Sequence, residues 1–178
     1  EFMESRSEGA NPVFMRYFLS DAANQASVVE ECFRDNRFCA MSIVEQPPLD
    51  GSKVALWVYL MKDVEIYEAE SGLWEVRQGD IRHLWLGGSF VRGGDSETQM
   101  RNLLENYVEA LKDNGCTLSR DCIRTWIFVQ NVDVNYAGVV KARRELFDSE
   151  GLTSQTHYVA STGIAGRNAY PDTLVILD

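Results

Sequence analysis

The clearest pattern in the sequence is an amphipathic helix over residues 96–115. Its apolar residues fall at i, i+3, i+4, i+7, i+8 and i+11, which places them on one face of a helix. Ser96 and Gln99 have the spacing of an N-terminal capping box, and Gly115 stands where a left-handed C-terminal cap belongs. This helix therefore needs an apolar surface to pack on.

A second helix and several strands complete the downstream part of the chain. The helix is predicted over 134–149, with Asp133 as a candidate N-cap and Gly151 after its end. Both helices are expected to pack on one face of a sheet, because their apolar stripes need a common surface. Runs rich in β-branched and aromatic residues predict the strands of that sheet, over 83–90, 123–129, 156–160 and 173–177.

The upstream part repeats the order of the downstream part's second half. Within residues 12–66 the patterns predict a strand, a short helix and two strands, over 13–19, 26–34, 38–44 and 53–60. This β-α-β-β order indicates an internal half-repeat, and a chance alignment of an α+β chain is the alternative. Residues 67–82, in an acidic stretch, are expected to be a connector or an edge hairpin.

Composition and charge exclude some classes of partner. The chain has 178 residues, 45% of them hydrophobic, which is enough for a real core. Its 17 basic and 27 acidic residues give a net charge of −10, which repels phosphate backbones, so no nucleic-acid partner is expected. The longest apolar run, Val54 to Met61, is far shorter than the roughly 20 residues of a membrane helix, so no membrane partner is expected.

The cysteines and the first residues carry further expectations. Four cysteines without a C-x-x-C pair and only two histidines predict a reduced cytoplasmic protein with no metal site and no cofactor. Glu1 and Phe2 precede Met3, so residues 1–11 are expected to be a cloning scar and a disordered tail. The strand predicted at 173–177 stops without a polar tail, and the half-repeat lacks a first β-α portion, so we expect a fragment of a longer protein.

The downstream part resembles a known family. The residues that carry the resemblance are the turn Leu86-Gly87-Gly88-Ser89, the helix from Glu97 to Asn106, the strand from Arg124 to Val129, and the helix from Tyr136 to Phe147. In order and spacing, residues 83–178 are similar to the RidA/YjgF family of reactive intermediate deaminases, once described as endoribonucleases. This resemblance implies an α+β, chorismate-mutase-like fold with two helices on one face of a mixed sheet. It also implies a homotrimer with ligand clefts between subunits.

The residues that the family uses for deamination are largely replaced. Where the resemblance implies an Arg that holds a carboxylate, this sequence has Gln155, and where it implies an acid on the last strand, it has Ile176. The family's usual Asn, Cys and Ser positions align with Val140, His157 and Gly87. Without the carboxylate clamp and the acid that positions water, little remains to stabilise developing charge. Imine hydrolysis of the family type is therefore not expected.

A glycine-bearing segment, residues 157–167, offers different chemistry. Its Ser-Thr-Gly and Gly-Arg groupings are similar to those of chorismatases, which hydrolyse chorismate. Arg167 could bind a carboxylate bidentately, and His157 is the candidate general base because its ordinary pKa lies near neutrality. The alternatives are a loop between two strands with a solvated Arg167, and a packed His157. Arg143 and Arg144 could contact an anion, or form a solvated helix face.

These observations lead to one function and two alternatives. The leading hypothesis is a RidA-like homo-oligomer, with a trimer favoured, that binds or processes a small carboxylate metabolite at a subunit cleft. The alternatives are a chorismatase-like hydrolase of chorismate or a related enol ether, and a non-catalytic pseudo-domain used for assembly. The candidate catalytic residue is His157, and the candidate ligand-binding residues are Gly87, Gly88, Ser89, Tyr158, Ser161, Thr162 and Arg167.

Overall fold

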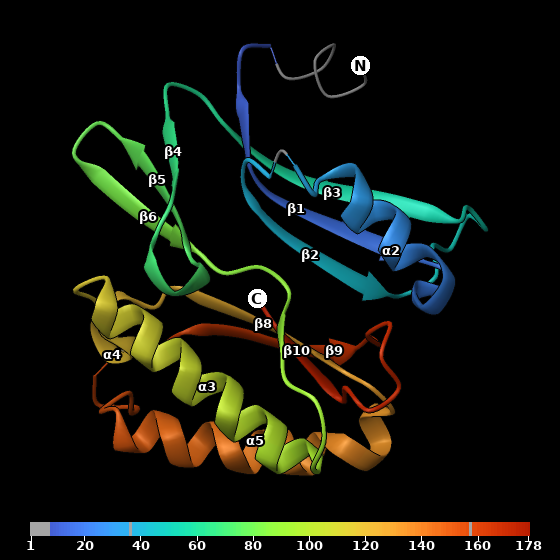
Figure 1. Ribbon diagram of the computed structural model, residues 1–178. Helices are drawn as coiled ribbons and strands as arrows, with labels where there is room; N and C mark the ends of the chain where they lie inside the picture. The colour runs from blue at the N-terminus through green and yellow to red at the C-terminus, as the bar shows by residue number, and fades with distance from the viewer. Residues whose placement is uncertain (1–7, 36, 157) are drawn as a thin grey trace.

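The computed structural model describes residues 8–35, 37–156 and 158–178, which form three sheets and their covering helices. Figure 1 shows one sheet with helix α2 on its outer side, a second sheet covered by α3 and α5, and a small antiparallel sheet to one side. The expected tail lies outside the described residues as far as residue 7. The elements in chain order are β1 (Asn11–Leu19), α2 (Ala22–Cys32), β2 (Ala40–Glu45), β3 (Val54–Met61), β4 (Glu65–Glu68), the 3₁₀ turn η1 (Glu70–Gly72), β5 (Trp74–Gln78), β6 (Ile81–Trp85), β7 (Ser89–Phe90), α3 (Ser96–Asp113), α4 (Leu118–Asp121), β8 (Arg124–Val129), α5 (Val132–Ser149), β9 (Ala160–Ala165) and β10 (Val175–Leu177).

The first and last parts of the chain have the same topology. β1 runs parallel to β2 across helix α2 and antiparallel to β3. β8 likewise runs parallel to β9 across helix α5 and antiparallel to β10. The strand orders β2-β1-β3 and β9-β8-β10 therefore correspond, with a seventh strand, β7, added beside β10. The predicted β-α-β-β half-repeat is confirmed as a repeat of topology.

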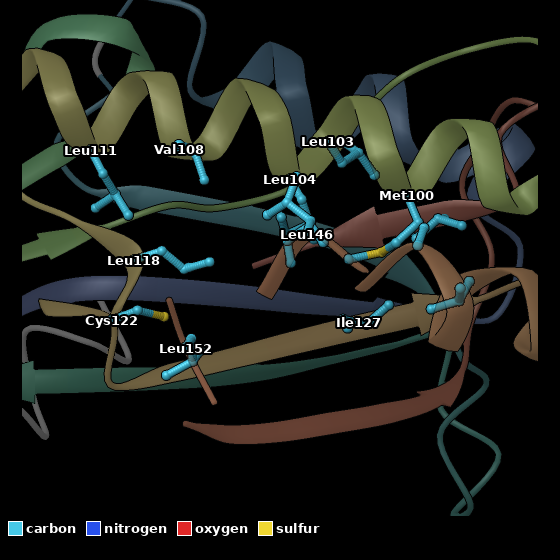
Figure 2. Packing of buried hydrophobic residues seen from close by; sticks show 14 of the residues in the cluster. Met100, Leu103, Leu104, Val108, Leu111, Leu118, Cys122, Ile127, Leu146 and Leu152 are labelled. Carbon is cyan, nitrogen blue, oxygen red and sulfur yellow. The ribbon is translucent and has the colours of Figure 1, made fainter. Parts of the chain in front are cut away.

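Helices α3 and α5 pack on one face of the sheet β7-β10-β8-β9, as predicted. Figure 2 shows side chains of α3, among them Met100, Leu104 and Leu111, pointing towards the region of the strands that carries Ile127. Burial of this apolar area supplies most of the stability of an amphipathic helix. The buried cluster comprises Met100, Leu103, Leu104, Val108, Leu111, Leu118, Cys122, Ile127, Val129, Val139, Ala142, Leu146, Leu152, Val175 and Leu177.

The helix starts differ slightly from the prediction. The N-cap of α3 is Asp95 and not Ser96: the Asp95 carboxylate accepts a hydrogen bond of 2.8 Å from the backbone N–H of Thr98. α5 begins two residues earlier than expected, at Val132, after Asn131 in a left-handed conformation. A glycine with positive φ, Gly115 or Gly151, stands two residues after the end of α3 and of α5, as the predicted caps require.

Two strand predictions were wrong in their bounds. The strand expected over 156–160 is β9, Ala160–Ala165, so most of the predicted glycine-bearing loop is a strand. Gly163 is needed there because a Cβ would lie 2.6 Å from the Tyr136 ring of α5; the glycine marks a close approach and not a turn. The strand expected over 83–90 is divided between β6 and β7, and the stretch 67–82 contains hairpin strands.

A buried ion pair joins the two large sheets. Arg16, in the middle of β1, donates from Nε and Nη2 to Oδ2 of Asp178, which follows β10, at 2.9 and 2.6 Å. The backbone N–H of Gly88 donates to the other carboxylate oxygen at 2.7 Å. Burial raises the pKa of the Asp178 carboxyl, and the guanidinium and this amide oppose the shift.

Aromatic rings from both sheets surround the same guanidinium. A cation over a ring face gains roughly 2 kcal/mol when the pair is desolvated, which helps to offset the cost of burying Arg16. The distances from the guanidinium carbon to the ring centroids are 5.1 Å for Phe14, 5.3 Å for Trp57, 4.6 Å for Trp126 and 5.0 Å for Phe128.

We predict that Asp178→Asn lowers the free energy of unfolding by about 3–5 kcal/mol, because it leaves the buried Arg16 without a counter-charge. The double variant Arg16→Met/Asp178→Leu should lose much less, because neither charge then remains buried. Urea denaturation of Arg16→Met, of Asp178→Leu and of the double variant gives the coupling free energy. A double variant as unstable as the sum of the singles would contradict the prediction.

Candidate functional site

The structure contains a hollow of about 400 Å³ between the first and second parts of the chain. Its walls come from the end of α2, from β2, from the turn before β7 and from the loop after β9. A volume of this size suits a small ligand. The lining residues are Ala26, Glu30, Phe33, Arg34, Arg37, Met41, Ile43, Gly87, Gly88, Phe90, Asn168, Ala169 and Tyr170.

Two of the predicted ligand-binding residues, Gly87 and Gly88, line this hollow. A Cβ at Gly87 would lie 2.6 Å from the backbone nitrogen of Met41, so only glycine allows the turn to lie against β2. Gly88 has a φ of +63°, and its N–H is already bound to Asp178. The Gly87–Gly88 turn therefore shapes one wall of the hollow, while the Gly88 N–H binds the internal Asp178 carboxylate. Ser89 begins β7 immediately after this wall.

The charged groups at the hollow are two arginines and one glutamate. Arg34 makes an ion pair of 3.6 Å with Glu31, in which both side chains are 69% exposed. Arg37 and Glu30 are also exposed. An exposed ion pair contributes little to stability, so the Arg34 guanidinium can exchange its partner for a ligand at small cost.

One side of the hollow is a braced aromatic wall. The Tyr170 and Phe90 rings pack at a centroid distance of 5.6 Å. Arg92 lies over the Tyr170 ring at 4.7 Å and binds both oxygens of Asp172 at 3.0 Å. These contacts hold the loop after β9 in place against β7.

The predicted site residues of the segment 157–167 do not converge on the hollow. His157 lies outside the described residues, and Tyr158 is 83% exposed. Ser161 accepts hydrogen bonds of 2.9 Å from the Thr125 hydroxyl and from Nη1 of Arg143. Its hydroxyl therefore binds α5 and β8, and Arg143 is not a purely solvated residue.

The two remaining residues of that segment also have internal partners. Thr162 accepts a hydrogen bond of 2.9 Å from Arg124, whose guanidinium lies 4.0 Å from the centroid of the Trp126 ring. Arg167 makes a 3.2 Å ion pair with Glu45, and the backbones of these two residues exchange hydrogen bonds of 2.8 and 3.1 Å. Arg167 thus holds the end of β9 to the end of β2.

Comparisons with known proteins identify the fold. No family model matches the sequence, and a search of curated proteins finds no match. A solved YjgF-family protein from Neisseria meningitidis matches with a TM-score of 0.50 at 14% identity, over 65% of this chain and 90% of that one. The chain has the YjgF-type fold.

Two further solved structures match over similar lengths. A member of the YjgF/YER057c/UK114 family from Mycobacterium tuberculosis matches with a TM-score of 0.45 at 25% identity, over 58% of this chain and 79% of that one. An uncharacterised protein from Pseudomonas aeruginosa matches with a TM-score of 0.49 at 19% identity, over 64% of this chain and 93% of that one. The match with a TM-score of 0.50 confirms the RidA/YjgF resemblance at the level of the fold.

The two positions that the resemblance aligns with deaminase residues lie in different surroundings. Gln155 lies exposed in a turn between α5 and β9. Ile176 is 1% exposed and packs with Val44 and Phe128 between the sheets. Asp178, the last acidic residue of the sequence, lies two residues after Ile176, on the same face of the strand. Its carboxylate is bound by the Arg16 guanidinium.

Sequence reasoning missed Arg16, Asp178, Arg34 and Arg37. A signal for Arg16 was present, because it is the single charged residue within an otherwise apolar strand over 13–19. Arg34 and Arg37 follow a short helix in an acidic chain, and only the approach of the turn before β7 makes them part of a hollow.

The two buried cysteines, Cys39 and Cys122, have unreactive thiols, and the described residues contain no metal-binding cluster. Burial raises the pKa of the Cys39 thiol to about 12 and also raises that of Cys122, so neither is an activated thiolate. Within the described ranges, no group of three His, Cys, Asp or Glu residues is placed to hold a metal ion. No helix in these ranges has the length and apolar character needed to span a membrane.

We predict that Ser161→Ala lowers the free energy of unfolding by about 1–3 kcal/mol, because it leaves the buried Thr125 hydroxyl and Arg143 without their partner. Thr162→Val is the control: its partner Arg124 is exposed, and the change should stay within about 0.5 kcal/mol. Urea denaturation measures both. Equal stability of the two variants would contradict the internal role of Ser161.

Proposed function

We propose that this RidA-like protein is a homo-oligomer that binds or processes a small carboxylate metabolite in the hollow beside Gly87. The observation that carries the proposal is the pair Arg34 and Arg37 at the rim of a hollow with aromatic and glycine walls. A guanidinium matches a carboxylate in a bidentate geometry.

The charge and shape of the hollow favour a small ring-bearing acid over a polyanion. The chain carries a net charge of −10, so long phosphate polymers are repelled, while a single carboxylate can meet the guanidinium groups of Arg34 and Arg37 at the hollow. Phe33, Phe90 and Tyr170 line the hollow and offer apolar faces to a ring. Cyclic carboxylates such as benzoate fit this chemistry.

Binding is better supported than catalysis of either known kind. The exposed Gln155 and the buried Ile176 supply neither a carboxylate clamp nor an acid that positions water for imine hydrolysis. A chorismatase-like site built on Arg167 and Ser161 would first have to break their bonds to Glu45 and Arg143. We therefore favour ligand binding, with any reaction depending on groups that the ligand or a second subunit brings.

We also propose self-association and a reducing compartment. The family resemblance favours a homotrimer with the hollow near a subunit boundary. All four cysteines are free, which suits the cytoplasm.

Isothermal titration with benzoate tests the proposal. We expect Arg37→Ala and Arg34→Ala each to weaken benzoate binding by about tenfold or more, because a hydrogen bond to a charged group contributes about 1.5–3 kcal/mol. Arg144→Ala, on the exposed face of α5, should leave the affinity unchanged. Benzamide, which has the same ring without the charge, is the control ligand.

Two results would overturn this assignment. Equal binding of benzamide and benzoate would show that the arginines do not recognise the charge. Absence of benzoate binding at millimolar concentration would favour the non-catalytic pseudo-domain instead.

A separate prediction concerns the lost deaminase chemistry. Gln155→Arg alone should give no imine hydrolysis, because binding a ground-state carboxylate does not by itself lower a chemical barrier. Ile176 supplies no acid, and Asp178 is held by Arg16. Ammonia release from the imine of a 2-oxo acid is the measurement, with the unsubstituted protein as the control. A substantial rate from this single change would show that another acid positions the water.

A further inference from the structure

Strand β3 is an open and uncharged sheet edge. Its eight residues, Val54–Met61, contain no charged residue and no proline, and among the described residues it pairs with β1 alone. Leu56, Trp57, Tyr59 and Leu60 are each 36–45% exposed. Natural proteins protect such edges with charges, prolines, bulges or a covering segment, because an open apolar edge pairs with other strands.

The internal repeat shows that a strand in this position takes a second neighbour. β10, which corresponds to β3, pairs with β8 on one side and with β7 on the other. The opposite edge of the sheet β2-β1-β3 is also covered. There β2 lies against Gly87, and Glu45 at the end of β2 exchanges backbone hydrogen bonds with Arg167. Unlike β10 and β2, β3 therefore has no neighbouring segment bonded to its free side among the described residues.

The backbone register defines which groups face outward. Ser20 donates its N–H to the carbonyl of Lys53 at 3.0 Å, which makes this position a hydrogen-bonded pair of the β1–β3 ladder. Hydrogen bonds alternate along an antiparallel strand, so the odd-numbered residues of β3 bond to β1. The backbone N–H and C=O groups of Val54, Leu56, Val58 and Leu60 accordingly point away from β1.

We propose that β3 pairs antiparallel with β3 of a second copy of this chain, around a two-fold axis at Val58. The sequence around Val58 is self-complementary: Leu56 then lies opposite Leu60 of the second copy, and Trp57 lies opposite Tyr59. Leucine and aromatic cross-strand pairs are stabilising. The outward backbone groups of Val58 meet those of its own copy, as a hydrogen-bonded pair requires.

Charge complementarity favours this occupant and this register. The same pairing brings Lys53, immediately before β3, towards the bend after Met61 that carries Asp63 of the second copy, twice in the dimer, in a molecule whose net charge of −10 otherwise opposes self-association. A two-fold contact uses one patch on both copies, so each contribution counts twice. The proposed β3 contact rests on the self-association in the proposed function and identifies the surface that mediates it. Benzoate binding is measured in a separate experiment.

Light scattering after gel filtration tests the contact. We expect the unsubstituted protein to form a dimer, or a hexamer if two trimers join, and Val58→Lys to halve that mass. Ile81→Lys, at a 59% exposed apolar position of the edge strand β6, is the matched control and should leave the mass unchanged. Circular dichroism establishes that both variants are folded.

Cross-linking supplies a second readout that does not depend on disrupting the strand. In a hydrogen-bonded antiparallel pair the Cα atoms lie about 5.5 Å apart, within the range of a disulfide. With the exposed Cys32 changed to serine, Val58→Cys should form a disulfide-linked dimer on mild oxidation, whereas Ile81→Cys should not.

The outcomes separate this inference from the proposed function. A trimer whose mass Val58→Lys leaves unchanged, without the Val58→Cys cross-link, would overturn the β3 contact and leave the proposed function standing. A monomeric unsubstituted protein would overturn both the contact and the self-association, while benzoate titration would still report on the hollow.

Discussion

Arg16 and Asp178 bring opposite charges into the space between two apolar sheets, where neither could remain alone. Taking both groups out of water costs several kcal/mol, which their attraction offsets only if the remaining hydrogen-bonding capacity is satisfied. Here two guanidinium nitrogens share one carboxylate oxygen, the amide of Gly88 binds the other, and four aromatic rings enclose the cation. The hydrogen bond from the Gly88 N–H to Asp178 also fixes the Gly87–Gly88 turn against β2. This wall of the hollow therefore depends on the ion pair.

Local patterns predicted much of the fold because they are repeated along short stretches of sequence. The apolar stripe of α3 and the β-α-β-β order could be predicted from spacing alone, and the structure confirms both. The bounds of β9 could not, because Gly163 and Gly166 signal a turn in sequence but serve close contacts with Tyr136, Val44 and Phe128. A glycine pattern does not distinguish these two uses.

The candidate site was harder to predict because its parts are distant in sequence. Arg16 and Asp178 are separated by 162 positions, and no local pattern pairs them. Ser161 and Arg167 were singled out for hydroxyl and guanidinium groups suited to an anion, but α5 and β2 satisfy those groups internally. Arg34 and Arg37 resemble ordinary solvated arginines until the fold sets a glycine turn and an aromatic wall beside them.

The two parts of the chain are therefore complementary and not two independent units. The upstream half-repeat supplies the buried cation Arg16 and the rim arginines of the hollow, while the downstream part supplies the acid, the glycine turn and Tyr170. The downstream part alone would expose to water the apolar sheet face that carries Trp126, Phe128 and Ile176, because the upstream sheet covers that face in the structure. Folding and the shape of the hollow consequently depend on the same contact between the halves, so a change that separates the sheets also opens the hollow.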